Sequence, residues 1–220
     1  MRSADVRILE GVELGVDVEL QPPCIIGEPA RGHRAGSVAT RIGASSVIRA
    51  FTIVYAGAWF GERVQTGHGA LIREGNVIGD DSSVGSYSIL EGRCAIGKRV
   101  RIHSRCFLSS VTIGDDAFIG PGVVFTDDPH PPCPKYVECG QGVVVETGAK
   151  IGGGAVLLPG VTVGAYSLIG GGSVVANDVL PRTVAVGNPA RAIKTIDQLD
   201  CFAGLYSRVF EWENGSGRDT

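Results

Sequence analysis

The sequence is poor in the features that mark nucleic-acid-binding, membrane and secreted proteins. Its 20 Lys and Arg are balanced by 23 Asp and Glu, for a net charge of −3, and aromatic residues make up only 6% of the chain. A chain near charge balance lacks the basic surface that binds nucleic acid or acidic lipid. No stretch approaches the roughly 18 apolar residues that span a membrane. We therefore expect no nucleic-acid or membrane partner.

A secretory signal is also missing from the start of the chain. The segment MRSADVRILEGVELG has no apolar run behind a basic start. A chain without that signal is expected in the cytoplasm, where thiols stay reduced. We therefore predict that the six cysteines are free thiols.

Glycine, by contrast, is abundant, with 33 residues among 220. Glycine allows tight turns, and the many Val and Ile residues favour strands. Hydrophobic residues make up 44% of the chain, which is ample for a buried core. The composition therefore predicts short strands joined by repeated turns.

An aliphatic residue recurs at every sixth position along most of the chain. This beat starts at Ile8, breaks over residues 27–41, resumes at Ile42 and slips by one residue between Leu108 and Ile113. After the break its members, with Thr66 as the polar exception, are Ile42, Ile48, Val54, Phe60, Thr66, Ile72, Ile78, Val84, Leu90, Ile96, Ile102, Leu108, Ile113, Ile119, Phe125, Val145, Ile151, Leu157, Val163, Ile169 and Val175. The fourth residue after each beat is nearly always small or β-branched, with Asn76 as the exception.

A period of six fits neither an α-helix nor an ordinary strand. It does fit a coil of three short strands and three turns, in which the aliphatic beat points into a triangular core. Stacked coils then pair as parallel strands, one coil above the next. We predict an all-β parallel β-helix, with Cys94 and Cys106 at small core positions.

The rhythm divides the chain into three parts. Residues 1–41 form a starting coil and a loop, 42–194 form the β-helix with an inserted loop at 126–142, and 195–220 form the C-terminal part. In the last part, Thr195-x-x-Gln198 reads as a helix capping box. The apolar stripe that follows predicts a helix to about Trp212, and its members are Ile196, Leu199, Phe202, Leu205, Tyr206, Val209 and Phe210.

Three runs carry a family resemblance: IGDDAFIGPGVVFTDD, IGGGAVLLPGVTVGAYSLIGGGSVVANDVLP and VAVGNPARAIK. They resemble the hexapeptide-repeat acyltransferases, especially those that acetylate sugars and nucleotide-linked amino sugars. The resemblance is strongest over 96–194, and over 42–95 only the generic repeat matches. It implies a left-handed β-helix, a hand that the general crossover rule does not predict. It also implies acetyl-CoA as acyl donor, direct transfer without an acyl-enzyme, and a homotrimer with sites between prisms.

The long interruption FTDDPHPPCPKYVECGQG, residues 125–142, is the expected place for chemistry, because loops on a stiff scaffold commonly carry sites. His130, set between prolines, is the first candidate for the general base. Members of the family carry a catalytic His in this loop, often before a Pro, which His130-Pro131 resembles. Asp127 stands where relatives often carry Asn or Asp, and it is the second catalytic candidate; an Asx turn is its plain structural alternative.

The same interruption holds two cysteines, Cys133 and Cys139, close to His130. Together they could hold a metal ion, but C-x5-C is no standard zinc knuckle and no fourth ligand is evident. We therefore assign no metal ligands from the sequence. Cys133 as an acyl-carrying nucleophile is disfavoured by the direct transfer that the resemblance implies.

For acetyl-CoA, the resemblance implies a groove along the last coils, where two glycines 18 residues apart let pantetheine approach the backbone. The residues so assigned are Gly153, Gly171, Ala176, Asn177, Arg191 and Lys194. Many relatives have Thr-Lys where this chain has Ala176-Asn177, which leaves Lys194 and Arg191 for the charged end of the nucleotide. Simple coil turns are the plain structural alternative for these glycines.

The function expected from these residues is acetyl transfer to the amine of a nucleotide-linked amino sugar. Sugar O-acetylation is the alternative within the same chemistry, and a non-catalytic β-helix scaffold is the alternative of another class. A zinc hydratase of the γ-carbonic anhydrase type uses the same fold, but the four histidines (33, 68, 103 and 130) lack the close pairing that its site needs.

Overall fold

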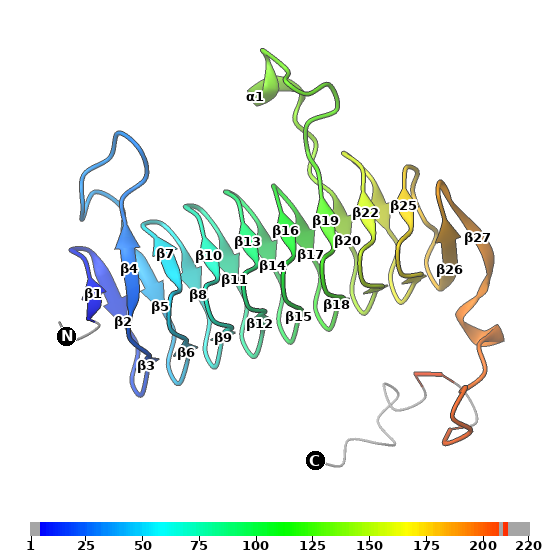
Figure 1. Cartoon of the computed structure of the whole chain (residues 1–220), viewed down its shortest axis with the longest axis horizontal. Helices are drawn as coiled ribbons and strands as arrows, with labels where there is room; N and C mark the ends of the chain where they lie inside the picture. Colours follow the sequence, from blue (N-terminus) through cyan, green and yellow to red (C-terminus); the bar gives the residue numbers. More distant parts are fainter. Residues whose placement is uncertain (1–4, 207–208, 211–220) are drawn as a thin grey trace.

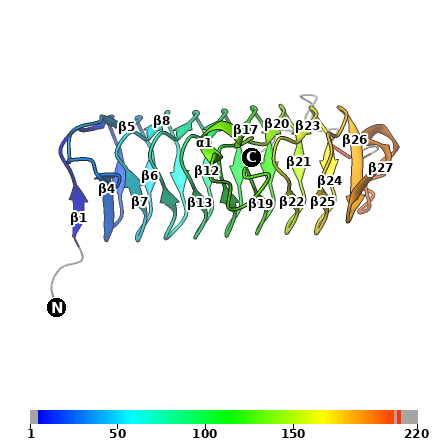
Figure 2. The same ribbon diagram turned by 90° about the horizontal axis from the view of Figure 1, so that it is seen from above.

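In the computed structural model, residues 5–206 and 209–210 are described, and they form one long solenoid (Figure 1). Each coil contributes one short strand to each of three sheets, which contain 9, 8 and 10 strands. Viewed from above, the coils stack in a straight row (Figure 2). In the regular coils, pairing runs 18 residues ahead: Leu71 pairs with Ile89, which pairs with Phe107. The predicted parallel β-helix is confirmed.

The three sheets are named A, B and C in the order in which the chain visits them. Sheet A contains β1 (Val6–Ile8), β4 (Cys24–Glu28), β7 (Ile53–Tyr55), β10 (Leu71–Ile72), β13 (Ile89–Leu90), β16 (Phe107–Leu108), β19 (Val124–Phe125), β22 (Val156–Leu157) and β25 (Val174–Val175). Sheet B contains β2 (Val12–Leu14), β5 (Thr40–Ile42), β8 (Trp59–Phe60), β11 (Val77–Ile78), β14 (Ala95–Ile96), β17 (Thr112–Ile113), β20 (Val144–Val145) and β23 (Thr162–Val163).

Sheet C contains β3 (Glu19–Leu20), β6 (Val47–Ile48), β9 (Gln65–Thr66), β12 (Ser83–Val84), β15 (Arg101–Ile102), β18 (Phe118–Ile119), β21 (Lys150–Ile151), β24 (Leu168–Ile169), β26 (Thr183–Gly187) and β27 (Ala190–Thr195). All of its pairings are parallel except the last, because β27 turns back antiparallel to β26. This hairpin covers the C-terminal end of sheet C.

The beat residues form the core, and from Ile26 onward they are almost fully buried. Ile8 and Leu14 are half and about two-fifths exposed, because their coil has a paired neighbour on one side only. Thr66, the polar beat residue, is fully buried, and its Oγ1 accepts the Arg49 N–H at 3.0 Å. A second hydroxyl, Thr52 Oγ1, lies 3.2 Å away, so the polar position is satisfied inside the core.

The predicted C-terminal helix from Thr195 to about Trp212 is wrong for the described residues. Gln198 Oε1 accepts the Thr195 N–H at 2.9 Å, but only a 3₁₀ turn, Ile196–Gln198, follows. Ile196 is buried, but Phe202 and Leu205 are exposed, so the middle of the apolar stripe is not packed on the prism. A short helix without such packing is marginal in water. Trp212 lies outside the described residues.

No helix within the described part of the chain is both long enough and apolar enough to cross a bilayer.

Two segments leave the prism, both where the chain passes from sheet A to sheet B, which we call the A/B corner. One joins β4 to β5 and the other joins β19 to β20; both rise from the same edge (Figure 1). The second carries α1 (Tyr136–Cys139) and is called the excursion, residues 126–143.

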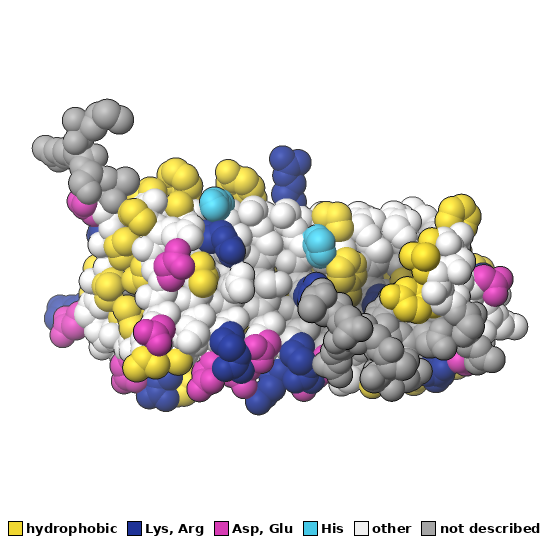
Figure 3. Space-filling model, turned by 90° about the horizontal axis from the view of Figure 1, so that it is seen from below, with side chains coloured by type: hydrophobic (Ala, Val, Ile, Leu, Met, Phe, Trp, Pro, Cys, Tyr) yellow, Lys and Arg dark blue, Asp and Glu magenta, His cyan; other side chains and the backbone are white. Residues whose placement is uncertain are grey.

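The corner where the chain passes from sheet B to sheet C, the B/C corner, carries charges of both signs, seen along one edge in Figure 3. There Arg63 bonds Asp81 and Arg99 bonds Asp116, at 2.6 and 2.7 Å.

Candidate functional site

The excursion leaves and rejoins the prism at one narrow neck. The Gln141 N–H donates to the Asp127 carbonyl at 2.8 Å, and the Gly160 N–H donates to the Gln141 carbonyl at 3.0 Å. The next strand then resumes in register, with Thr112 paired to Val144. The loop is therefore an insertion at a corner, and the scaffold on either side of it is continuous.

Asp127 stands at this neck with its carboxylate nearly buried. Its Oδ2 accepts hydrogen bonds from Ser109 Oγ at 2.7 Å and from the Tyr136 hydroxyl, which is closer still. Burial raises the pKa of Asp127, but the hydrogen bonds from Tyr136, Ser109 and Ser110 lower it by more, so the net pKa is below the ordinary value. The hydrogen bond to Asp127 raises the pKa of Tyr136. The pair is thus an ionised carboxylate beside a neutral phenol at neutral pH.

A hollow of about 250 Å³ opens beside this pair. Both hydroxyl partners of Asp127, Ser109 and Tyr136, line it. The complete lining is Glu91, Gly92, Arg93, Ser109, Ser110, Tyr136, Val137 and Gly140. Polar donors, a carboxylate and a guanidinium surround a space large enough for part of a polar small molecule.

Sequence reasoning missed both Ser109 and Tyr136. Ser109 lies just after β16 in the coil below Asp127, where Phe107 pairs with Val124, so the stacking of coils brings it within reach of Asp127. Tyr136 has no periodic signal, because it sits inside the non-repetitive excursion.

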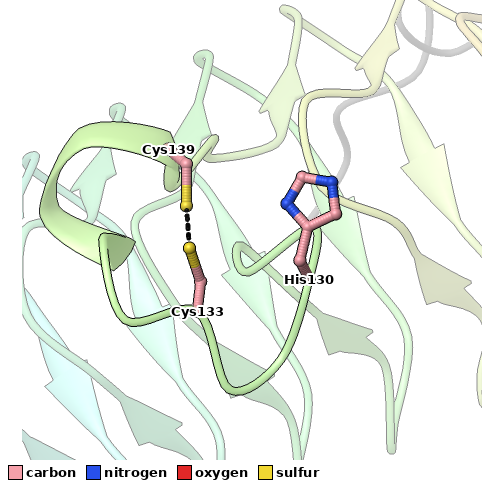
Figure 4. A group of neighbouring side chains, drawn as sticks. All are labelled: His130, Cys133 and Cys139. Atoms are coloured by element: carbon pink, nitrogen blue, oxygen red, sulfur yellow. Dashed lines mark hydrogen bonds between the residues drawn. The ribbon is translucent and has the colours of Figure 1, made fainter.

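His130 lies on the outer part of the excursion and is exposed. Its backbone N–H donates to Asp128 Oδ1 at 2.9 Å, and the Cys133 N–H donates to Asp128 Oδ2 at 3.0 Å. The imidazole lies close to the sulfur atoms of Cys133 and Cys139 (Figure 4). The two catalytic candidates are therefore held differently: Asp127 by hydroxyls at the neck, His130 in a group with two cysteines.

The two sulfur atoms of that group are 2.7 Å apart, and both cysteines are free thiols. The hydrogen bond with Cys133, followed by desolvation, raises the pKa of Cys139 to about 11. A thiol with a raised pKa is a poor nucleophile at neutral pH. The raised pKa therefore does not favour Cys139 as acyl carrier.

Gly153 and Gly171 stack at the corner between sheets C and A, the C/A corner. The Gly172 N–H donates to the Gly153 carbonyl at 2.9 Å. A Cβ added to Gly171 would lie 3.2 Å from that carbonyl, and one added to Gly153 would lie 3.2 Å from Pro121 Cδ. Close stacking alone thus favours glycine at both positions, whatever else binds there.

The remaining residues assigned to acetyl-CoA fall in two places. Arg191, on β27, pairs with Val186, whose side chain lies against Gly170, so Arg191 is beside the C/A corner. Lys194 is further along β27 and exposed. Ala176 and Asn177 follow β25 at the A/B corner, the corner of the excursion. Within one chain, sheet A separates the glycine corner from the excursion.

The face of sheet A between these two corners is apolar. One outward-pointing residue per coil forms a row that is only partly buried: Ile25, Ile53, Leu71, Ile89, Phe107, Val124, Val156 and Val174. The matching row of sheet C mixes polar and apolar residues and includes Gln65, Ser83, Arg101, Phe118 and Leu168. A contiguous apolar row on a water-exposed face is typical of an interaction surface.

No family model matches the chain. It is 37% identical over 95 residues to the galactoside O-acetyltransferase of Escherichia coli, covering 41% of this chain and 47% of that protein. It is 30% identical over 187 residues to the bifunctional protein GlmU of Alkalilimnicola ehrlichii, covering 84% of this chain and 36% of GlmU. The chain thus spans less than half the length of these curated relatives.

Among solved structures, it is similar to the UDP-N-acetylglucosamine acyltransferase from Campylobacter jejuni. The TM-score is 0.56 at 18% identity, covering 86% of this chain and 72% of that one. That likeness supports the solenoid fold. The six-residue beat and the sequence matches show a hexapeptide-repeat chain that is similar to acetyltransferases of that family.

Proposed function

We propose that the protein is an acetyltransferase that uses acetyl-CoA to acetylate a sugar, with the amine of a nucleotide-linked amino sugar as acceptor. The observation that carries the proposal is the Asp127 carboxylate, held by Ser109 and Tyr136 beside a polar hollow. Relatives named galactoside O-acetyltransferase and bifunctional protein GlmU support the class of reaction.

An ionised carboxylate at this place suits an amine acceptor. It attracts the ammonium form of the sugar and orients it at the neck of the excursion. The ammonium group first loses one proton to solvent, and the resulting amine attacks the thioester carbonyl. A second proton then passes from the nitrogen to Asp127 and on to the CoA thiolate, which leaves as the C–S bond breaks. His130 is the other candidate to receive the proton, as the only imidazole of the excursion.

The site proposed here is shared between copies of the chain. The glycine corner with Arg191 lies across sheet A from the excursion, so one chain alone keeps the proposed donor groove and acceptor hollow apart. A second copy packed on the apolar row of sheet A brings its own corner toward the first copy's excursion. A closed homotrimer satisfies this contact for every copy.

The test is release of free CoA thiol from acetyl-CoA in the presence of a panel of acceptors. The panel pairs each nucleotide amino sugar with its hydroxyl analogue, and includes simple galactosides. We expect turnover with an amino sugar and little with its hydroxyl analogue. Turnover with galactosides alone supports O-acetylation, for which the E. coli relative is the specific observation.

Absence of turnover with every acceptor, together with no binding of acetyl-CoA by calorimetry, would refute acetyl transfer and leave the scaffold alternative. Binding without turnover calls for a wider acceptor panel, since the donor groove would then be intact.

A further inference from the structure

Three metal-ligating side chains converge in the outer part of the excursion, apart from the Asp127 carboxylate. The ligating atoms of His130, Cys133 and Cys139 all lie within 4.8 Å of one another (Figure 4). Over residues 5–206 and 209–210, no other three His, Cys, Asp or Glu side chains converge in this way. Acetyl transfer through Asp127 does not use these sulfur atoms.

The backbone of the excursion builds this convergence. The Asp128 carboxylate accepts the N–H of both His130 and Cys133, which fixes the turn that carries two of the ligands. The Tyr136 N–H donates to the Cys133 carbonyl at 3.1 Å and starts α1, whose last residue is Cys139. A C-x5-C spacing that looks irregular in the sequence thus becomes a compact pair, because one helical turn returns the chain.

We propose that His130, Cys133 and Cys139 bind one Zn²⁺ ion, which clips the excursion into a fixed shape. Two thiolates and an imidazole are a donor set that zinc prefers. Each thiol gives up its proton to solvent on binding, the imidazole binds as the neutral ring, and a water completes the tetrahedron.

The geometry requires only a small adjustment. Zinc–sulfur bonds of about 2.3 Å place two thiolates roughly 3.7 Å apart. The sulfur atoms are now 2.7 Å apart, so they must separate by about an ångström. Rotation of two partly exposed side chains supplies that movement.

Zinc at this place changes the role of His130. An imidazole that coordinates an ion cannot take a proton from the acceptor, which leaves Asp127 as the proton acceptor. The zinc site goes beyond acetyl transfer and does not depend on it, since its occupation can be followed by the spectrum of Co²⁺ bound in place of Zn²⁺.

The test uses the full chain, reduced, stripped by a chelator and titrated with Co²⁺. Tetrahedral thiolate ligation gives sulfur-to-cobalt charge-transfer bands and intense visible bands. We expect saturation at one equivalent per chain and displacement by Zn²⁺. Cys133→Ser and Cys139→Ser should remove the charge-transfer intensity or weaken binding at least about tenfold. Cys201→Ser is the matched control, because Cys201 is a free, partly exposed thiol outside the cluster, and it should bind as the unchanged protein does.

Two His130 variants test the third ligand. His130→Ala should weaken Co²⁺ binding, whereas His130→Cys should keep it and increase the charge-transfer intensity through a third sulfur. A thiol can replace an imidazole as a metal ligand but does not replace it as a general base. Higher turnover of His130→Cys than of His130→Ala therefore supports the role of His130 as a ligand. The proposal is overturned if the doubly substituted Cys133→Ser, Cys139→Ser protein binds Co²⁺ as tightly as the unchanged chain, or if His130→Ala leaves the spectrum and affinity unaltered.

Discussion

Asp127 shows how one residue is placed by both the repetitive and the irregular part of the chain. The prism supplies Ser109 from the coil below, and the excursion supplies Tyr136 from α1. The two hydroxyls stabilise the charged carboxylate against the cost of its burial. A group held in this way has a fixed direction, which is what orientation of an acceptor requires.

We predict that Asp127→Asn lowers kcat by about two to four orders of magnitude, because the amide can neither attract an ammonium group nor take its proton. Acetyl-CoA affinity should change little, since its proposed groove lies at another corner. Steady-state kinetics with the amino sugar, and calorimetry with acetyl-CoA, measure the two effects. Tyr136→Phe should cost less, because Ser109 still holds the carboxylate. Near-normal turnover of Asp127→Asn would remove this residue from the reaction.

Asp127 should also contribute to stability in a pH-dependent way. Its pKa is lower in the folded chain than the roughly 3.9 of an unfolded Asp. The folded state therefore gains stability from ionised Asp127 above about pH 4, and loses it as the pH falls through the lowered value. Urea unfolding of the unchanged chain and of Asp127→Asn should show a difference in unfolding free energy that narrows toward low pH. A difference independent of pH contradicts the assignment.

At the scale of the element, the coil depends on a hydrogen bond that passes from one coil to the next. Ser82 Oγ accepts the Val100 N–H, Ser88 Oγ accepts the Cys106 N–H, and Asn76 Oδ1 accepts the Cys94 N–H. The Asn76 amide also donates to the carbonyls of Arg73 and Leu90. Asn76, the exception in the small-residue pattern, thus accepts a backbone N–H from the next coil, as Ser82 and Ser88 do in their coils.

We predict that Asn76→Ala destabilises the chain by about 1–3 kcal/mol, because it leaves the buried Cys94 N–H without its partner. Asn76→Ser should recover part of the loss, since serine fills the equivalent place in neighbouring coils. Chemical denaturation of the two variants compares them, with Ser83→Ala on the outer face as control. Equal loss in both variants would mean that packing volume, and not the hydrogen bond, decides the cost.

Substitution of an aliphatic beat residue in the core should destabilise the chain more than substitution of Asn76. Ile151→Asp places a charge at a fully buried position in β21. The aliphatic beat residues of the core cannot pair with that charge. We expect a loss of more than about 4 kcal/mol, which is exceptional for a single substitution. Circular dichroism and thermal melting should show a largely unfolded protein, while Arg101→Asp, at an exposed outward position of β15, should keep the strand signal. A cooperative melt near the normal temperature would argue against the register.

The elements that the sequence predicted are those that repeat. Each beat residue from Ile26 to Val175 is buried in the expected coil, because a triangular prism leaves one inward position per strand. The prediction of a C-terminal helix was wrong, because such a helix needs a surface against which to bury its apolar stripe. In the described chain Phe202 and Leu205 have no such surface and are exposed. The hydrogen bond from the Tyr136 hydroxyl to Asp127 could not be predicted from the sequence. No sequence period sets the position of α1 relative to the prism.

At the scale of the whole molecule, the apolar row of sheet A is the proposed contact between copies of the chain. We predict that Phe107→Glu prevents association, because it places a charge in the middle of that row. Phe118→Glu is the matched control on sheet C, where the outward ring faces His103. Light scattering after size exclusion should give a lower mass for the first variant and an unchanged mass for the second. Equal masses for both variants would place the contact on another face.

A shared site further predicts complementation between two inactive variants. Asp127→Asn damages the excursion, and Gly171→Leu obstructs the glycine corner, where an added Cβ is already within 3.2 Å of a carbonyl. Mixed oligomers of the two should regain a fraction of the activity, because some interfaces then combine an intact excursion with an intact corner. No recovery after co-refolding, with both variants still assembled, would locate the whole site in one chain.

The narrow neck of the excursion has a consequence for how such proteins diversify. A hydrogen bond between Asp127 and Gln141 closes the loop where it meets the prism, and strand pairing resumes as if nothing had been inserted. A different loop can therefore replace the excursion at this corner without changing the strand pairing of the coils on either side. If the excursion binds the acceptor, as proposed, acceptor specificity can change through this loop alone while the coils keep their packing. The segment joining β4 to β5 leaves the same edge and offers a second place for such grafts.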